Sequence, residues 1–231
     1  MNAPATSTVQ QDENALRRSW LDRLAQQGDE LDQLAVLGAQ KIQRSGSTPK
    51  VLDADFGDGA FALRLARSGA EVLAIDRDQN GSALTAAARV LGVDDKLRFL
   101  KWITGCGDTT PLPGGPFDIV ANHRSLSLMP YAQGVVMVSE LLLNTRIGGR
   151  LYLSAYGLHS DLGDDYEHAT KPARERFAPL HPETAARYGI TDPVCLYSER
   201  DLFLLLFEAG ASVLRTFTTT HGNVKAIGVR I

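Results

Sequence analysis

One short stretch of the chain determines how the rest of the sequence is interpreted. It consists of Val51-Leu52-Asp53-Ala54-Asp55-Phe56-Gly57-Asp58-Gly59. Its apolar start predicts a short buried strand, and its two glycines predict a tight turn before a helix expected at residues 60–67. Glycine allows a ligand to approach the backbone closely, and the beginning of a helix presents exposed N–H groups. We therefore expect a ligand that contains a nucleoside at this strand-to-helix turn.

The chain on either side of the turn alternates short apolar strands with amphipathic helices. Strands are expected at residues 51–54, 72–75, 97–102, 117–121 and 151–155, and further helices at 83–91, 135–144 and 202–207. This alternation predicts βαβ units and a parallel sheet. Ser198 to Asp201 fit a capping box before the last helix. Residues 212–219 and 224–231, joined by His221-Gly222-Asn223, predict an antiparallel hairpin.

The segments outside this pattern have different compositions. Residues 1–12 are polar and are predicted to be disordered, whereas residues 13–231 are expected to form one domain. Within it, residues 13–48 carry apolar side chains at helical spacing and are expected to form a helical amino-terminal cover. Residues 156–197 are rich in proline, histidine and charge. This is long for a connection in a compact domain, so we expect a lid or substrate insertion there.

Composition restricts the class of protein. The chain has 231 residues, 44% of them hydrophobic and 22% charged, which suffices for a full core without disulfides or metals. Cys106 and Cys195 lie far apart and neither belongs to a Cys/His cluster, so no metal site is expected. The net charge of −3 and the pI of about 6.0 argue against a nucleic-acid partner, which would require a broad positive field.

The sequence also bears on location and partners. No apolar run approaches the roughly 20 residues that cross a bilayer, and residues 1–13 lack the basic and apolar regions of a signal peptide. We therefore expect a cytoplasmic protein with no membrane partner and with a small-molecule substrate. The sequence leaves the oligomeric state open.

With its glycine turn and the order of its motifs along the chain, the protein resembles the class I S-adenosylmethionine-dependent methyltransferases. Their first motif is a strand that ends in an acidic residue, followed by Gly-x-Gly-x-Gly. Asp53 matches the acidic residue, Gly57 and Gly59 match the second and third glycines, and Asp76 matches the acid that accepts hydrogen bonds from both ribose hydroxyls. The resemblance covers roughly residues 50–231 except 156–197, and includes Pro111-Leu112-Pro113, Phe117-Asp118-Ile119-Val120 and Arg146-Ile147-Gly148-Gly149-Arg150-Leu151.

The resemblance implies a fold, a reaction and a cofactor. The expected fold class is α/β: a Rossmann-like, mostly parallel sheet of seven strands with an antiparallel last strand and helices on both faces. The expected cofactor is S-adenosylmethionine, held at the carboxyl ends of the first, second and fourth strands. Its expected ligands are Asp53, Asp55, Phe56, Gly57, Asp58, Gly59, Asp76, Arg77, Trp102, Ile103 and Asn122. Trp102 or Ile103 would pack on the adenine; the alternative for Trp102 is a place in the core.

The chain departs from the family motif at the first glycine, where it has Asp55. Aspartate tolerates the left-handed backbone conformation better than most residues, and its carboxylate could face the ammonium group of the cofactor. The departure also motivates a second hypothesis, a protein that binds S-adenosylmethionine without turnover.

Candidate catalytic and substrate residues follow the fourth and fifth strands. His123 lies at the carboxyl edge of the sheet, where ligands bind in open α/β folds, and it is a candidate general base or orienting group; the alternative is a solvent-exposed loop histidine. Tyr156 and His159 are candidates for substrate contact. Asn122-His123-Arg124-Ser125 lacks the two prolines of amino-methylating members, which disfavours DNA-base or glutamine-amide methylation. We expect O- or N-methylation of a small molecule or sugar.

Two further alternatives stay open at this point. Gly57-x-Gly59-x-x-Ala62 also satisfies a loose dinucleotide fingerprint with Asp76 as the ribose acid, so an NAD-dependent oxidoreductase is the rival class; the terminal hairpin favours the methyltransferase. The charge run Glu167–Arg176 is expected to be a solvated helix face, with contact to an anionic substrate as the alternative.

Overall fold

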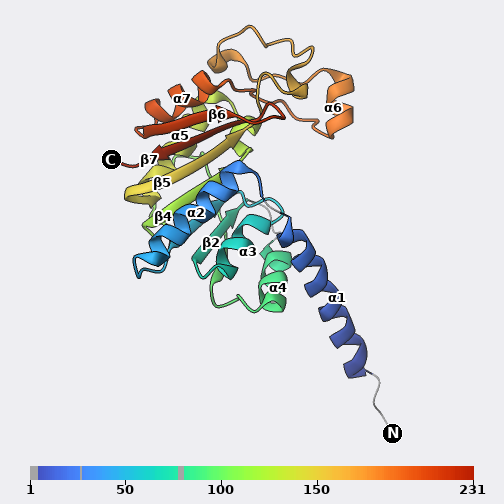
Figure 1. The fold of residues 1–231 in the computed structure, drawn as a ribbon. Helices are drawn as coiled ribbons and strands as arrows, with labels where there is room; N and C mark the ends of the chain where they lie inside the picture. Colours follow the sequence, from blue (N-terminus) through green and yellow to red (C-terminus); the bar gives the residue numbers. More distant parts are fainter. Residues whose placement is uncertain (1–4, 27, 78–80) are drawn as a thin grey trace. The chain divides into compact units, whose positions relative to one another are not determined.

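The computed structural model describes residues 5–26, 28–77 and 81–231. Its strands, numbered along the chain, form one seven-stranded sheet in the order 3-2-1-4-5-7-6. Figure 1 shows the ribbon with most of the elements labelled. The chain divides into two compact units, Met1–Trp102 and Ile103–Ile231, which are described in turn.

The first unit contains three parallel strands. Its elements are α1 (Ala5–Ala25), α2 (Glu30–Arg44), β1 (Lys50–Ala54), α3 (Ala60–Arg67), β2 (Glu71–Asp76), α4 (Gly81–Leu91) and β3 (Leu97–Lys101). β2 pairs with β1 on one side and with β3 on the other, both in parallel. The predicted helix at residues 60–67 is confirmed at both ends, because its apolar face is buried and Gly59 and Ser68 end the helical backbone.

The amino-terminal helices differ in one respect from the sequence prediction. Disorder is predicted for residues 1–12, whereas α1 begins at Ala5; residues 1–4 lie outside the described residues. No glycine or proline interrupts the sequence between Ala5 and Ala25, so the helix that contains Trp20 and Leu24 extends further toward the amino terminus. Asp29 caps α2 by accepting hydrogen bonds from the N–H groups of Leu31 and Asp32.

The second unit contains the other four strands. Its elements are β4 (Phe117–His123), η1 (Ser125–Leu128), α5 (Tyr131–Asn144), β5 (Thr145–Ala155), η2 (Asp161–Gly163), η3 (Ala173–Glu175), α6 (Pro182–Tyr188), α7 (Glu199–Glu208), β6 (Ser212–Thr218) and β7 (Val224–Val229). β4 and β5 are parallel, and β7 is antiparallel to both β5 and β6. The predicted terminal hairpin is therefore confirmed, and so is the capping box of Ser198 and Asp201.

The sheet order decides between the two classes of nucleotide-binding fold that the sequence left open. In the dinucleotide-binding fold the strands follow the order 3-2-1-4-5-6. Here the hairpin inserts the antiparallel β7 between β5 and β6. The predicted α/β class with a mostly parallel seven-stranded sheet is confirmed, and the topology contradicts the oxidoreductase alternative.

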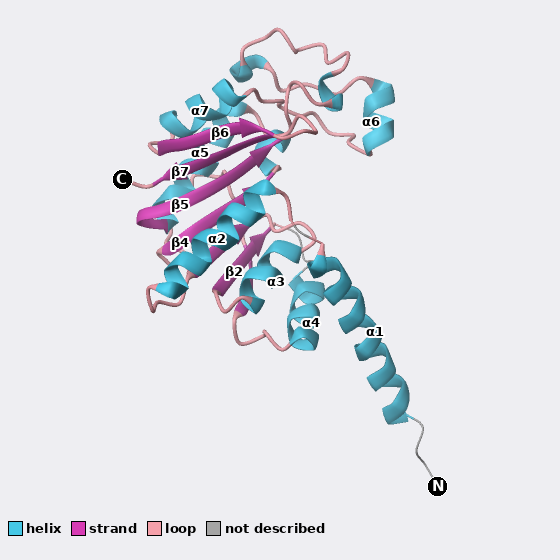
Figure 2. Cartoon of the chain, viewed as in Figure 1, coloured by secondary structure: helices cyan, strands magenta, loops and turns pink. Residues whose placement is uncertain are grey.

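The segment 156–197 consists mainly of loops (Figure 2), and its helical elements are the α-helix α6 and the short 3-10 helices η2 and η3. It nevertheless has a small apolar core, made of Leu162, Tyr166, Ala178, Leu180, Val194 and Leu196. The Tyr166 hydroxyl donates to the backbone oxygens of Arg176 and, at 2.7 Å, of Val194. Two isolated bridges, Gly157 with Tyr197 and Ala178 with Val194, tie the segment together.

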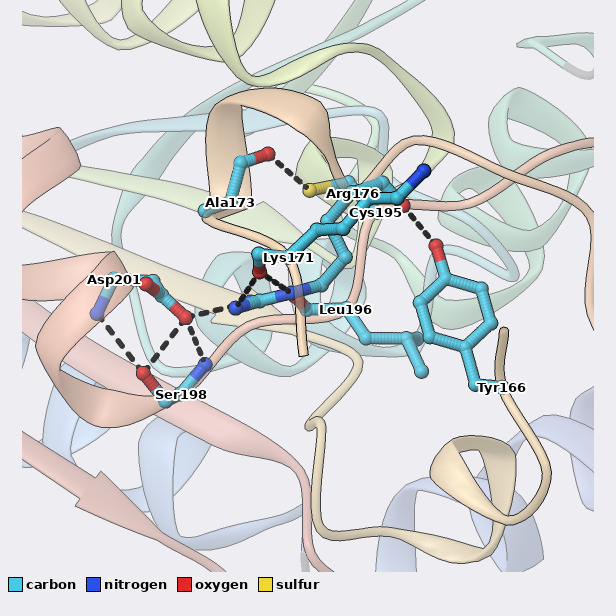
Figure 3. Close-up of polar contacts among 8 residues, drawn as sticks. All are labelled: Tyr166, Lys171, Ala173, Arg176, Cys195, Leu196, Ser198 and Asp201. Atoms are coloured by element: carbon cyan, nitrogen blue, oxygen red, sulfur yellow. Dashed lines mark hydrogen bonds and ion pairs between the residues drawn. The ribbon is translucent and has the colours of Figure 1, made fainter. Parts of the chain in front are cut away.

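The charge run Glu167–Arg176 is not the solvated helix face that the sequence predicts. Pro172 disfavours helical backbone in the residue before it, and only the short η3 turn forms. Arg176 is buried, with 6% of its surface exposed. Its guanidinium donates to the backbone oxygens of Lys171 and Leu196 and pairs with Asp201 at 2.7 Å (Figure 3). The insertion is therefore fastened to the amino-terminal end of α7 by a buried ion pair.

Candidate active site

The turn after β1 is built from three residues with left-handed backbone. Asp55, Gly57 and Gly59 have φ angles of 56°, 60° and 78°. Asp55 thus has the left-handed backbone that aspartate tolerates better than most residues. A Cβ atom on Gly57 would meet no atom within 4 Å, so the turn is open on that side. A Cβ on Gly59 would lie 2.6 Å from Cδ1 of Leu84, so that glycine also serves close packing against α4.

Two neighbouring members of the predicted set have structural contacts. One carboxylate oxygen of Asp58 accepts a hydrogen bond of 3.0 Å from the N–H of Ala60, the first residue of α3. Phe56 is buried and packs edge-on against Phe99, with ring centroids 5.7 Å apart. These contacts fix the turn between β1 and α3.

The two acids expected to bind the nucleoside lie on neighbouring strands of the first unit. Asp53 is fully buried and is in register with Ala74 of β2. Side chains alternate along a strand, so Asp53, Ala74 and Asp76 are on the same face of the sheet. The backbone oxygen of Asp76 accepts a hydrogen bond of 2.9 Å from the N–H of Trp102, which places half-buried Trp102 beside the end of β2. Arg77 is exposed.

The residues at the end of β4 belong to the second unit. Asn122 is fully buried, and its Oδ1 accepts a 2.7 Å hydrogen bond from the Ser125 hydroxyl. His123 is the last residue of β4, half-buried and in register with Ser154 of β5, so it is not the solvent-exposed loop histidine considered as the alternative. Arg124 follows with left-handed backbone, φ 69°. The chain therefore turns immediately after His123.

The two substrate candidates after β5 have different environments. Tyr156 is half-buried against the apolar core of the insertion; its N–H donates to the Ser127 hydroxyl at 2.8 Å. His159 is exposed and lines a cavity of about 470 Å³, together with Leu158, Ser160, Asp161, Gly163, Asp164, Ala169 and Thr170. About half of the wall of this cavity is polar. Ile103, the expected adenine contact in the second unit, is 51% exposed.

The sequence interpretation missed two buried polar residues of α5. Glu140 accepts hydrogen bonds from the backbone N–H groups of Gly105 and Gly107, and Asn144 accepts one from Leu112. All three donors belong to the connection between β3 and β4. The available signal was a single carboxylate within the apolar stretch Val135–Asn144, because a buried carboxylate requires hydrogen-bond donors from elsewhere.

Ionisation of the insertion residues follows their burial. Burial raises the pKa of the Cys195 thiol to about 11 and that of the Tyr166 hydroxyl to about 12. Burial also raises the pKa of Asp201, but hydrogen bonds from Arg176 and Ser198 outweigh it, so this pKa lies below its ordinary value. Asp201 is therefore ionised at neutral pH, opposite the guanidinium of Arg176.

The described ranges 5–26, 28–77 and 81–231 lack two structural features. No helix there is long and apolar enough to cross a membrane. No group of three or more histidine, cysteine or acidic side chains there is arranged to hold a metal ion.

Comparison with known proteins places this geometry in a class. A family model described as a methyltransferase domain matches residues 52–153. A methyltransferase from Methanosarcina mazei is 22% identical with a TM-score of 0.61, covering 80% of this chain and 93% of that one. The magnesium protoporphyrin IX methyltransferase from Synechocystis PCC 6803, solved with S-adenosylhomocysteine, is 20% identical with a TM-score of 0.57, covering 98% and 100%.

A third solved structure is longer than this chain. It is an O-methyltransferase family 2 protein from Planctomyces limnophilus in complex with apigenin, 19% identical with a TM-score of 0.60. The comparison covers 80% of this chain, which spans only 52% of that protein. At these identities the solved structures establish the fold alone. No curated protein sequence matches the chain.

The sheet order, the glycine turn and the family model together define a methyltransferase fold that uses S-adenosylmethionine. Residues 52–153 match the methyltransferase-domain family, and the fold of the chain is that of the class I S-adenosylmethionine-dependent methyltransferases. Its glycine turn fits the cofactor, because three left-handed residues shape it and it is open beside Gly57.

Proposed function

We propose that the protein methylates a hydroxyl or amine of a small molecule, with S-adenosylmethionine as the methyl donor. The observation that carries the proposal is the open left-handed turn at Asp55–Gly59, next to two acids, Asp53 and Asp76, on one face of the sheet. This arrangement suits a ligand with hydroxyl and ammonium donors, because carboxylates accept several hydrogen bonds each.

Each residue has a proposed task toward the cofactor. Asp76 accepts hydrogen bonds from the ribose hydroxyls, Asp55 faces the ammonium group, and Trp102 or Ile103 packs on the adenine. Asp53 and Asn122 add polar groups at the ends of β1 and β4. When bound, S-adenosylmethionine supplies an electrophilic methyl group, and alignment of the acceptor provides much of the rate.

His123 is the proposed proton acceptor. It ends β4, and the left-handed Arg124 directs the chain away immediately afterwards. An acceptor hydroxyl is a weak nucleophile until a base removes its proton, whereas a neutral amine attacks through its nitrogen lone pair and loses a proton only afterwards. The proposal therefore assigns removal of a hydroxyl proton to the His123 imidazole.

The insertion supports a polar acceptor. Its cavity of about 470 Å³ is lined by hydroxyl, carboxylate and imidazole side chains, among them Ser160, Asp161 and His159. A hydroxylated small molecule matches such walls better than an apolar one, since unpaired polar groups are costly to cover. The apigenin in the Planctomyces protein is also a small molecule. A small-molecule partner, no nucleic acid and a cytoplasmic location are parts of the same proposal.

The hypothesis of a protein without turnover rests on Asp55 alone. Since Asp55 has the left-handed backbone that the family glycine would adopt, with φ 56°, the turn keeps its shape. The structure thus gives no reason to prefer loss of activity.

Calorimetric titration with S-adenosylhomocysteine tests the proposal. We expect the wild-type protein to bind, and Asp76→Ala to weaken binding by about tenfold to a hundredfold, since it removes hydrogen bonds to a charged acceptor worth roughly 1.5–3 kcal/mol. The matched control is Asp95→Ala, an exposed acid outside the strands, which should bind as wild type. A folded wild-type sample that does not bind, or an Asp76→Ala variant with unchanged affinity, would contradict the proposal.

A further inference from the structure

Helix α5 carries a buried carboxylate that the proposed reaction leaves without a task. Glu140 is 6% exposed and is followed in the chain by Leu141, Leu142 and Leu143. One of its carboxylate oxygens accepts a 2.6 Å hydrogen bond from the N–H of Gly105, and the other accepts a short one from the N–H of Gly107. Glu140 thus binds the backbone of a segment 35 residues away in the sequence.

The segment held by Glu140 begins directly after Ile103. Gly105 and Gly107 both have left-handed backbone, with φ angles of 76° and 82°. The Cys106 thiol donates to the backbone oxygen of Ile103 at 3.3 Å, which closes the turn. A Cβ added to Gly105 would lie 3.4 Å from Cγ of Gln133 and 3.5 Å from Cβ of Met137. The segment therefore lies directly against α5, in a conformation that glycine allows and Glu140 fixes.

A second side chain of α5 provides a comparison one helical turn further on. Asn144 accepts a 2.8 Å hydrogen bond from the N–H of Leu112 and donates to the backbone oxygen of Glu140 at 3.0 Å. It is also buried, at 9% exposure. The connection from β3 to β4 is thus held at two points. Glu140 holds it at Gly105 and Gly107, close to Ile103, and Asn144 holds it at Leu112.

A buried carboxylate is retained only where strong donors compensate its loss of hydration. Apolar residues would fill the same space in α5 at no such cost. The geometry points to a positional role instead, because both acceptor oxygens are directed at one short piece of backbone. Holding that piece before a ligand arrives removes an ordering cost from binding.

We infer that Glu140 is a positioning residue for the cofactor: it holds residues 103–107 in the conformation that receives the adenosine half of S-adenosylmethionine. The inference rests on the proposed function. Glu140 itself does not touch the cofactor; it acts through the backbone that carries Ile103.

Calorimetry on the full chain tests this with two probes, S-adenosylhomocysteine and 5′-methylthioadenosine, which retains only the adenosine half. In Glu140→Gln, one oxygen becomes an NH₂ group that opposes an N–H donor. We expect the dissociation constants of both probes to rise by the same factor, about tenfold or more, since one charge-assisted hydrogen bond is lost. Glu140→Asp keeps the charge and should recover part of the affinity.

Asn144→Ala is the matched control, since it removes a buried anchor of the same connection at its far end. We expect it to bind both probes within about threefold of wild type. Equal losses in Glu140→Gln and Asn144→Ala would overturn the inference, and so would an unchanged affinity in folded Glu140→Gln. If Glu140→Gln does not fold, Glu140→Asp decides: wild-type affinity in that variant, together with rapid exchange of the Gly105 and Gly107 amide protons in the wild type, overturns it. Failure of the wild type to bind either probe would instead refute the proposed function.

Discussion

The turn at Asp55–Gly59 and the insertion at residues 156–197 owe their shapes to interactions of different range. The turn is set mainly by backbone conformation at three residues and by a contact from Asp58 to Ala60, two residues on, and Phe56 adds a packing contact with Phe99. The insertion is set by contacts such as Arg176 with Asp201, 25 residues apart, and Tyr166 with Val194, 28 residues apart. A region fixed mainly by local conformation depends less on distant partners than a region whose shape is fixed by those partners.

The difference affects how far the turn and the insertion would tolerate substitutions. Replacing the first family glycine by Asp55 leaves the turn intact, because aspartate can adopt left-handed backbone. The insertion has no such tolerance at Arg176, whose charge is buried and bound at Lys171, Leu196 and Asp201. The turn can therefore vary in sequence, whereas the insertion is held by a few buried contacts.

The largest expected effect comes from removing the ion pair of Arg176 with Asp201, which fastens the insertion to α7. Arg176→Met should destabilise the protein by about 3–5 kcal/mol, because it leaves Asp201 without the charge that compensates its burial. Denaturant unfolding measures the loss. The matched control is Arg174→Met, whose ion pair with Glu208 joins side chains 63% and 31% exposed and should contribute less than about 1 kcal/mol. Equal losses in the two variants would mean that the insertion is not fastened through Arg176.

A smaller effect is expected from the turn. Asp55→Val places a β-branched residue at φ 56° and should cost about 1–3 kcal/mol. Asp55→Gly restores the family glycine and should change the unfolding free energy by less than about 1 kcal/mol. Thermal unfolding of both variants measures the difference. A valine variant as stable as the glycine variant would show that the turn is not under this conformational constraint.

The smallest effect is a dependence on pH. The pKa of Asp201 in the folded protein lies below its ordinary value of 3.8, so its ionised form stabilises the fold above that value, and this contribution is lost as the pH falls through the lower, folded-state pKa. Unfolding free energies measured between pH 7 and pH 2 should decrease less in Arg176→Met than in the wild type. Arg174→Met should retain the wild-type decrease; identical curves for all three proteins would exclude Asp201 as a source of the acid sensitivity.

Much of the fold could be predicted from the sequence because its signals are local. The helix at residues 60–67, the terminal hairpin and the capping box of Ser198 each depend on residues close in the chain. The acids Asp53 and Asp76 could be assigned to strand ends for the same reason. The predicted start of β5 is wrong by six residues: the strand begins at Thr145, which pairs with Phe117 of β4, and Gly148 and Gly149 form backbone hydrogen bonds with Arg230.

The amino-acid sequence by itself determined the class of fold, the glycine turn and the positions of its acidic residues, since apolar periodicity and backbone preferences act over a few residues. Only the tertiary structure decided that Arg176 is buried and paired with Asp201 rather than solvated, and that Glu140 holds the backbone after Ile103. A charged side chain carries the same sequence signal whether it faces water or a partner 25 or 35 residues away. The packing of the folded chain selects between them, because burial penalises a charge unless donors or an opposite charge are brought to it.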